Sequence, residues 1–144
     1  MSRSIARELR IDASPEVVYE VISTPEHLRE WWPDEADLKA EAGAVGTITF
    51  DTHGVVPLTV VEADPPRRFA FRWTHPAGEA AGPANSLLTT FDLVPDGDGT
   101  LLKFLETGFD EAGRSDDELK DHTSGWDHFL PRLTSYAERV AGAS

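Results

Sequence analysis

Alternating apolar and polar positions near the beginning of the chain predict a β-strand over Ser4–Asp12. Ile5, Leu9 and Ile11 fall on one side of this segment, and polar residues dominate the other side. A strand with one apolar side is typical of a sheet that covers a core with one face and meets water with the other. The chain is therefore expected to begin with a half-buried strand.

Two helix-start signals follow this strand. Ser14-Pro15-Glu16 and Thr24-Pro25-Glu26 each combine a hydroxyl side chain that can cap a helix, a proline suited to the first turn and a carboxylate near the positive end of the helix dipole. The second helix is expected to end near Trp31-Trp32, because Pro33 stops it. Two short helices are therefore predicted directly after the first strand.

The middle of the chain, from about Asp37 to Phe109, alternates between short strand-like runs and turn residues. The turn sequences include His53-Gly54, Asp64-Pro65-Pro66 and the hairpin-type Pro95-Asp96-Gly97-Asp98-Gly99. A segment rich in small residues, 76–83, predicts a loop. The expected strands are 45–51, 55–62, 68–75, 87–94 and 100–107.

A long helix is predicted at the end of the chain, from about Ser115 to Val140. Ser115-Asp116-Asp117-Glu118 has the form of a capping box, which marks the start of a helix. Apolar residues then recur at spacings of three and four, which places them in one stripe. The stripe consists of Leu119, His122, Trp126, Phe129, Leu133, Ala137 and Val140.

This order of elements predicts an α+β fold in one domain over residues 1–144. A curved antiparallel sheet of about six or seven strands would wrap around the C-terminal helix, because no other element is long enough to cover its apolar face. One helix cannot fill the concave side of a wide twisted sheet. An internal cavity is therefore expected between the sheet and the helix.

Composition restricts the partners that such a domain would take. The formal net charge of −13 disfavours nucleic acid and anionic membrane surfaces. The beginning of the chain resembles no secretory signal, and no run approaches the roughly 20 apolar residues of a membrane-spanning helix. The chain has no cysteine, which excludes disulfides and thiolate chemistry. We therefore expect a cytoplasmic protein without nucleic-acid or membrane partners.

Aromatic residues at inward-facing positions are the main candidates for a ligand site. Plain core packing explains any one of them, but pockets for small molecules are lined by such side chains as well. Of the adjacent Trp31 and Trp32, one is expected in the core and one near the pocket mouth. The aromatic candidates for ligand binding are Trp32, Phe50, Phe71, Trp73, Phe91, Phe104, Trp126 and Phe129.

Three polar residues also occupy inward-facing positions of the predicted strands and the last helix: His75, Glu106 and His122. Glu106 shares its face with Leu102 and Phe104, so its carboxylate enters an apolar neighbourhood and requires a partner. One hypothesis is a structural pair with either histidine, and another is an acid–base pair acting on a ligand. The prediction tested below is that Glu106 lacks a protein partner and anchors the polar group of a ligand.

Other chemistry finds little support in the sequence. Glu118 and His122 are four residues apart on the long helix, as two metal ligands can be, but no third ligand has a diagnostic spacing. Gly97 and Gly99 lie between acidic residues, which repel phosphate. No Gly-x-Ser-x-Gly motif presents a nucleophile. We therefore expect no metal, no cofactor and no catalytic residue.

A series of short motifs occurs in order along the chain: Ala13-Ser14-Pro15-Glu16-Val17-Val18-Tyr19, Pro25-Glu26-His27-Leu28, Trp31-Trp32, Glu106-Thr107-Gly108-Phe109, Gly125-Trp126, Leu130 and Leu133. Their succession resembles the START-like superfamily, also called SRPBCC or helix-grip proteins. It is most similar to the branch named after the activators of the heat-shock-protein-90 ATPase. That resemblance implies a hydrophobic cavity for lipids, hormones, pigments or polyketides.

Three functions remain open at this point. The leading hypothesis is non-catalytic binding of a small hydrophobic or aromatic molecule between the sheet and the last helix. The first alternative, implied by the resemblance, is an interaction module that regulates a chaperone. The second alternative is an enzyme of the polyketide cyclase or dehydratase kind that uses Glu106 and a histidine.

Overall fold

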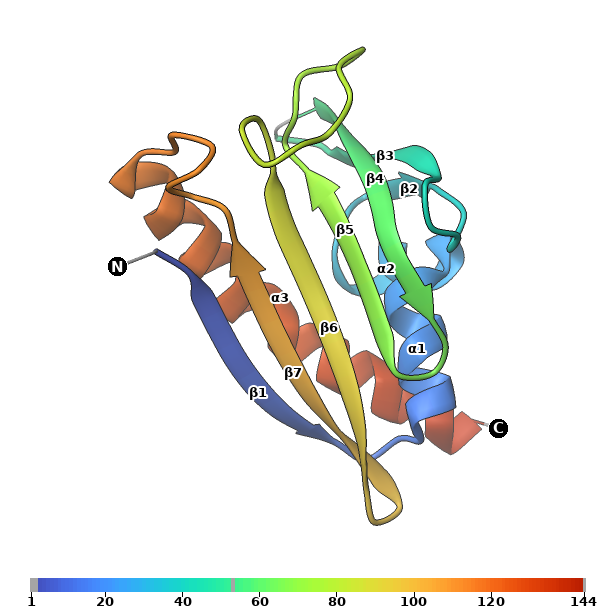
Figure 1. Cartoon of the computed structure of the whole chain (residues 1–144). Coiled ribbons are helices and arrows are strands. Elements are labelled where there is room, and N and C mark those ends of the chain that lie inside the picture. The colour runs from blue at the N-terminus through green and yellow to red at the C-terminus, as the bar shows by residue number, and fades with distance from the viewer. Residues whose placement is uncertain (1–2, 53, 144) are drawn as a thin grey trace.

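The computed structural model describes residues 3–52 and 54–143, so the expected turn at His53-Gly54 lies partly outside the described residues (Figure 1). Its strands form one seven-stranded antiparallel sheet in the order β1-β7-β6-β5-β4-β3-β2. The helices are α1 (Pro15–Ser23), α2 (Pro25–Trp31) and α3 (Asp116–Ala143). The strands are β1 (Ile5–Ile11), β2 (Glu35–Asp37), β3 (Val45–Phe50), β4 (Gly54–Asp64), β5 (Arg68–Trp73), β6 (Leu87–Asp96) and β7 (Gly99–Thr107).

The sheet places the first and last strands of the sequence side by side. β1 pairs with β7 along its whole length, from Ile5 opposite Glu106 to Ile11 opposite Thr100. Hairpins then connect β7 to β6, β6 to β5, β5 to β4 and β4 to β3. The α+β architecture, the two short helices and the long C-terminal helix are confirmed.

One strand, β2, is absent from the sequence-based expectation. It contains only Glu35–Asp37, and it pairs with Ile48 and its neighbours on β3. Three residues are too few to show an alternation of period two, and two of these three are exposed acids. Only the pairing with β3 identifies this segment as a strand.

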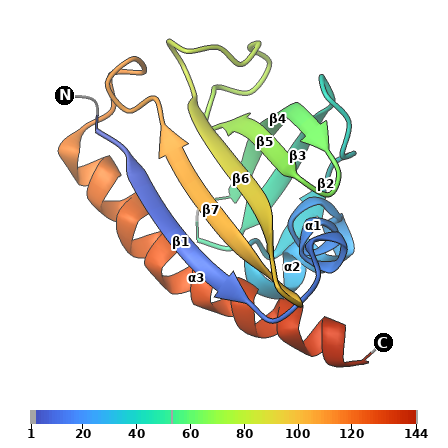
Figure 2. The same ribbon diagram turned by 60° about the horizontal axis from the view of Figure 1, so that its bottom comes forward.

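All three helices lie on the same face of the sheet (Figures 1 and 2). α1 begins as expected, because the backbone N–H of Val17 donates to the Ser14 hydroxyl at 3.3 Å. Thr24 makes no side-chain capping bond to α2. The indole N–H of Trp31 instead donates to the carbonyl of Val21 at 3.0 Å, which ties α2 to α1.

α3 crosses the sheet with its apolar stripe inward. Its start uses half of the expected capping box: the N–H of Glu118 donates to the Ser115 hydroxyl at 3.1 Å, while the Glu118 carboxylate turns to Arg114 at 2.8 Å. The helix continues through Pro131, whose ring is exposed on its outer side. Its buried apolar residues are Trp126, Leu130, Leu133 and Ala137.

Candidate functional site

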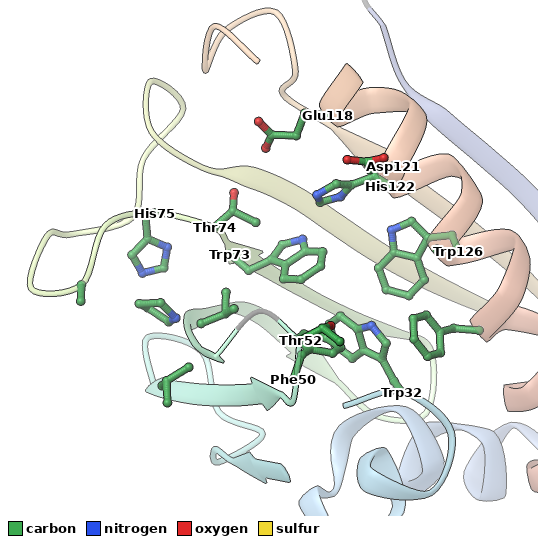
Figure 3. Close-up of a pocket in the computed structure, with 16 residues that line it drawn as sticks. Trp32, Phe50, Thr52, Trp73, Thr74, His75, Glu118, Asp121, His122 and Trp126 are labelled. Atoms are coloured by element: carbon green, nitrogen blue, oxygen red, sulfur yellow. The ribbon is translucent and has the colours of Figure 1, made fainter. Parts of the chain in front are cut away.

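A pocket of about 620 Å³ opens between the first half of α3 and the β3–β4 hairpin (Figure 3). The end of β5 forms its third wall, and Trp32 from the turn after α2 lies at its base. The residues that line it are Trp32, Phe50, Thr52, Val55, Val56, Pro57, Trp73, Thr74, His75, Ala77, Glu118, Asp121, His122, Gly125, Trp126 and Phe129.

Trp32 is the centre of the aromatic wall. Its ring centroid lies 5.1 Å from that of Trp73, 5.0 Å from that of Trp126 and 5.9 Å from that of Phe50. Trp31 stacks behind it at 5.9 Å and is completely buried. The expected division is confirmed only in part: Trp31 lies in the core, whereas Trp32 lines the pocket at its base and not near its mouth.

Behind this wall, Glu106 on β7 is completely buried and accepts hydrogen bonds at both carboxylate oxygens. The Trp73 indole N–H and the Thr89 hydroxyl donate to Oε2 at 2.9 and 2.7 Å. The Trp126 indole N–H donates to Oε1 at 3.1 Å, and Nδ1 of His122 lies 2.7 Å from the same oxygen. The prediction that Glu106 lacks a protein partner is therefore wrong, and of the two proposed histidine contacts the structure contains the one to His122.

The partners of Glu106 connect the buried carboxylate to the pocket. Trp73, His122 and Trp126 all line the pocket, whereas Glu106 does not. A carboxylate is expensive to bury without donors, and these bonds supply them. The Glu106 side chain thus fixes the orientation of three pocket rings from behind. The sequence did not reveal this arrangement, because the three donors come from β5 and from two turns of α3.

The end of β5 carries two polar atoms that are buried without a hydrogen-bond partner: Oγ1 of Thr74 and Nδ1 of His75. Thr74 has a φ of 70°, in the left-handed region that a β-branched residue rarely adopts. Its carbonyl accepts a bond from Arg114 at 3.0 Å. Burial lowers the pKa of His75, since its ring has little access to water. Strained backbone and unpaired polar atoms of this kind are concentrated at functional sites.

The expected ligand-binding residues fall into two layers. The residues of that set that line the pocket are Trp32, Phe50, Trp73, His75, His122, Trp126 and Phe129. The residues of that set that lie outside the lining are Phe71, Phe91, Phe104 and Glu106. These four form the buried layer behind the wall, where Phe104 packs against Trp126 with 4.6 Å between centroids. The alternation of side chains along the strands correctly predicted that these residues face inward. It did not predict which of them reach the pocket and which lie in the core behind it.

Several lining residues carry no sequence signal of a site. The sequence around Val55 on β4 is typical of any strand and does not indicate a pocket. The left-handed backbone of Thr74 is visible only in the structure. Gly125 is different, because a glycine on the pocket-facing side of a helix leaves a gap where another residue would place its side chain. A Cβ atom built on Gly125 would meet no atom within 4 Å, so this gap belongs to the pocket.

Two kinds of feature are absent from residues 3–52 and 54–143, the part of the chain that the structure describes. These residues contain no group of three or more histidine or acidic side chains arranged to hold a metal ion. Within the same ranges, no helix combines the length and the apolar character needed to cross a membrane.

Comparison with known proteins identifies the family. Residues 12–138 match the model of the family described as Activator of Hsp90 ATPase homolog 1-like protein, and the chain belongs to this family. The expected membership of the START-like superfamily is thereby confirmed. No curated protein matches the sequence.

Solved structures share the fold over nearly the whole chain. Protein MLL2253 from Mesorhizobium loti is similar with a TM-score of 0.79 and 24% identity, covering 95% of this chain and 98% of that one. The Aha1 dimer from Colwellia psychrerythraea is similar with a TM-score of 0.78 and 21% identity, covering 94% and 96%. CalU16 from Micromonospora echinospora is similar with a TM-score of 0.72 and 22% identity, covering 99% and 83%. At these identities the likeness concerns the fold.

Proposed function

We propose that this protein binds a small hydrophobic molecule with an aromatic ring in the pocket between α3 and the β3–β4 hairpin, and that it does so in the cytoplasm without converting the ligand. The observation that carries the proposal is the aromatic wall of Trp32, Trp73 and Trp126, held in place from behind by Glu106. A wall of fixed rings loses little conformational entropy when a ligand binds.

The size and polarity of the pocket support this proposal. Its volume of about 620 Å³ lies inside the range of about 300–1,000 Å³ typical of pockets for small molecules. Its base and walls are mainly aromatic and aliphatic, and its polar lining residues are Thr52, Thr74, His75, Glu118, Asp121 and His122. Such a surface favours a flat apolar body with a limited polar part.

Regulation of a chaperone is the second candidate, favoured by the description of the family to which residues 12–138 belong. A chaperone would contact an outer surface of the domain and would not enter a pocket of this size. A change that fills the pocket therefore separates the two candidates, because it abolishes ligand binding and leaves a surface interaction intact.

The experiment is a titration with 2-methylnaphthalene, followed by amide and indole N–H signals in two-dimensional NMR spectra. We expect saturable shifts of the indole signals of Trp32, Trp73 and Trp126, which line the pocket, and smaller shifts of Trp31, which does not. Gly125→Leu is the pocket-filling variant, because open space surrounds the position of its Cβ. Retained binding in this variant, or shifts confined to other surfaces, would contradict the proposed site.

A separate incubation with an aromatic β-hydroxyketone, which can lose water, addresses the enzyme alternative. A cyclase or dehydratase would use an acid–base group on its substrate, and His122 beside Glu106 is the arrangement that favours such a role. Ligand recovered unchanged after prolonged incubation with the protein supports binding alone. A product with a new mass would replace the binding proposal with an enzymatic one.

A further inference from the structure

His122 presents two different edges to its surroundings. Nδ1 faces inward and lies 2.7 Å from Oε1 of the buried Glu106. The ring is sandwiched between Trp73, at 5.2 Å between centroids, and Phe109, at 5.7 Å. Its side chain keeps 15% of its surface exposed, and the residue lines the pocket. One edge of the imidazole is therefore held by the protein, and the opposite edge, with Nε2, is directed away from Glu106.

The partners of Glu106 determine which nitrogen of His122 carries the proton. The indole N–H groups of Trp73 and Trp126 can only donate, and each occupies one carboxylate oxygen. The Thr89 hydroxyl donates to Oε2 as well. A carboxylate surrounded by donors is an acceptor at every position, so Nδ1 of His122 donates to it. In the neutral form of the imidazole, the lone pair then lies at Nε2.

We propose that Nε2 of His122 accepts a hydrogen bond from a hydroxyl group of the ligand, and that the pocket therefore selects neutral hydroxylated aromatic molecules such as phenols and naphthols. The inference rests on the proposed binding function and specifies its ligand class. Figure 3 shows His122 beside Trp73 and Trp126, so a ring held by the aromatic wall brings its edge to the imidazole. Glu106 acts through His122 as a positioning residue, which replaces its expected role as the anchor itself.

The charges around the pocket favour a neutral hydroxyl over a carboxylate. Asp121 and Glu118 also line the pocket beside His122. Glu118 is paired with Arg114 at 2.8 Å, whereas Asp121 is exposed on the next turn. Asp121 therefore repels an anionic ligand group, and the buried Glu106 adds to this repulsion. A hydroxyl group donates its proton to Nε2 and brings no negative charge.

A matched pair of ligands tests the proposal: 2-naphthol and 2-methylnaphthalene, which have nearly the same shape and differ in one hydroxyl group. A net hydrogen bond corresponds to about a five- to tenfold preference for 2-naphthol in the parent protein. His122→Phe keeps a flat ring in the wall and removes the acceptor. We expect this variant to lose the preference, so that 2-naphthol binds it no more tightly than 2-methylnaphthalene does, because the buried hydroxyl then has no partner.

Two further variants guard against indirect effects. His122→Asn can keep a donor near the position of Nδ1 for Glu106 but has no atom at the position of Nε2, so it should fold even if the phenylalanine variant does not, and it should also lose the preference. Thr89→Val removes a different donor from Glu106, at a residue that does not line the pocket. This control should lose stability and retain the preference for 2-naphthol.

Three outcomes would overturn the inference. Equal affinities of the parent for the two ligands would refute the proposed hydroxyl-binding role of His122. The proposed binding of apolar aromatic molecules would still stand. A preference that survives in His122→Phe and disappears in His75→Phe would move the anchor to the unpartnered nitrogen of His75. Long-range ¹H–¹⁵N spectra of the free protein that show a proton on Nε2 of His122, in the neutral or in the charged ring, would refute the acceptor, whether or not either naphthalene binds.

Discussion

The two halves of α3 lie over the same sheet, but one half closes the core and the other half borders an open pocket. In the closed half, Leu130, Leu133 and Ala137 are buried against a surface to which α1 and α2 contribute. In the open half, from Glu118 to Phe129, the helix faces the β3–β4 hairpin across a pocket of about 620 Å³. The apolar stripe runs through both halves, so the stripe itself does not distinguish a core from a binding site. The short helices make the difference, because they fill the concave side at one end only.

The largest effect is expected from the residue that supports the open half. Glu106→Gln replaces one carboxylate oxygen by an NH₂ group. This group is itself a donor, so it cannot accept the hydrogen bonds that the replaced oxygen accepted. Breaking a buried charged network of this kind costs about 3–5 kcal/mol of unfolding free energy. Urea unfolding of the parent and the variant measures the loss. Glu8→Gln, an exposed glutamate on β1, is the matched control and should leave stability unchanged. A Glu106→Gln variant as stable as the parent would show that the network contributes nothing.

The next prediction compares the two halves directly. Leu133→Ala, in the closed half, leaves a cavity in a packed core and should lower the unfolding free energy by about 2–5 kcal/mol. Phe129→Ala removes more atoms, yet Phe129 is only half-buried and already faces open space, so its loss should be clearly smaller. The midpoints of thermal unfolding rank the two variants. The reverse order would mean that the open half is as tightly packed as the closed half.

A gain is expected at Gly125 in the open half. Its added Cβ would meet no atom within 4 Å, so Gly125→Ala should contribute only its better helix propensity, about 0.8–1.0 kcal/mol of added stability. Gly142→Ala, near the end of the same helix and equally unobstructed, should contribute less because helix ends fray. Chemical unfolding of both variants provides the comparison. Destabilisation by Gly125→Ala would show that the space beside Gly125 is occupied.

The smallest effect concerns pH. Burial holds the pKa of His75 below its ordinary value, so the unfolded chain binds a proton at a higher pH than the folded protein does. The free energy of unfolding should therefore fall as pH decreases through about 6.5. His75→Phe should weaken this dependence. Unfolding at about pH 7.5 and about pH 5.5 shows the difference, and identical pH profiles of the parent and His75→Phe would contradict it.

The candidate site shows where sequence-based prediction stops. Glu106 was predicted to face inward, and it does, but its partners come from β5, β6 and α3. Periodicity gives the direction of a side chain relative to its own element and not the distance to other elements. For the same reason Phe104 and Trp126 looked equivalent in sequence, although only Trp126 reaches the pocket wall.

The sequence by itself determined the local elements, because capping residues, prolines and the periods of two and 3.6 act within a few residues of each other. It also determined which face of each element is apolar, and hence the sheet wrapped on a terminal helix. Only the tertiary structure decided which apolar positions are core and which line the pocket, because that depends on where α1 and α2 stop covering the sheet. It likewise decided that Glu106 is satisfied by the protein and that His122 carries the open nitrogen, since four donors from three different elements meet at that carboxylate.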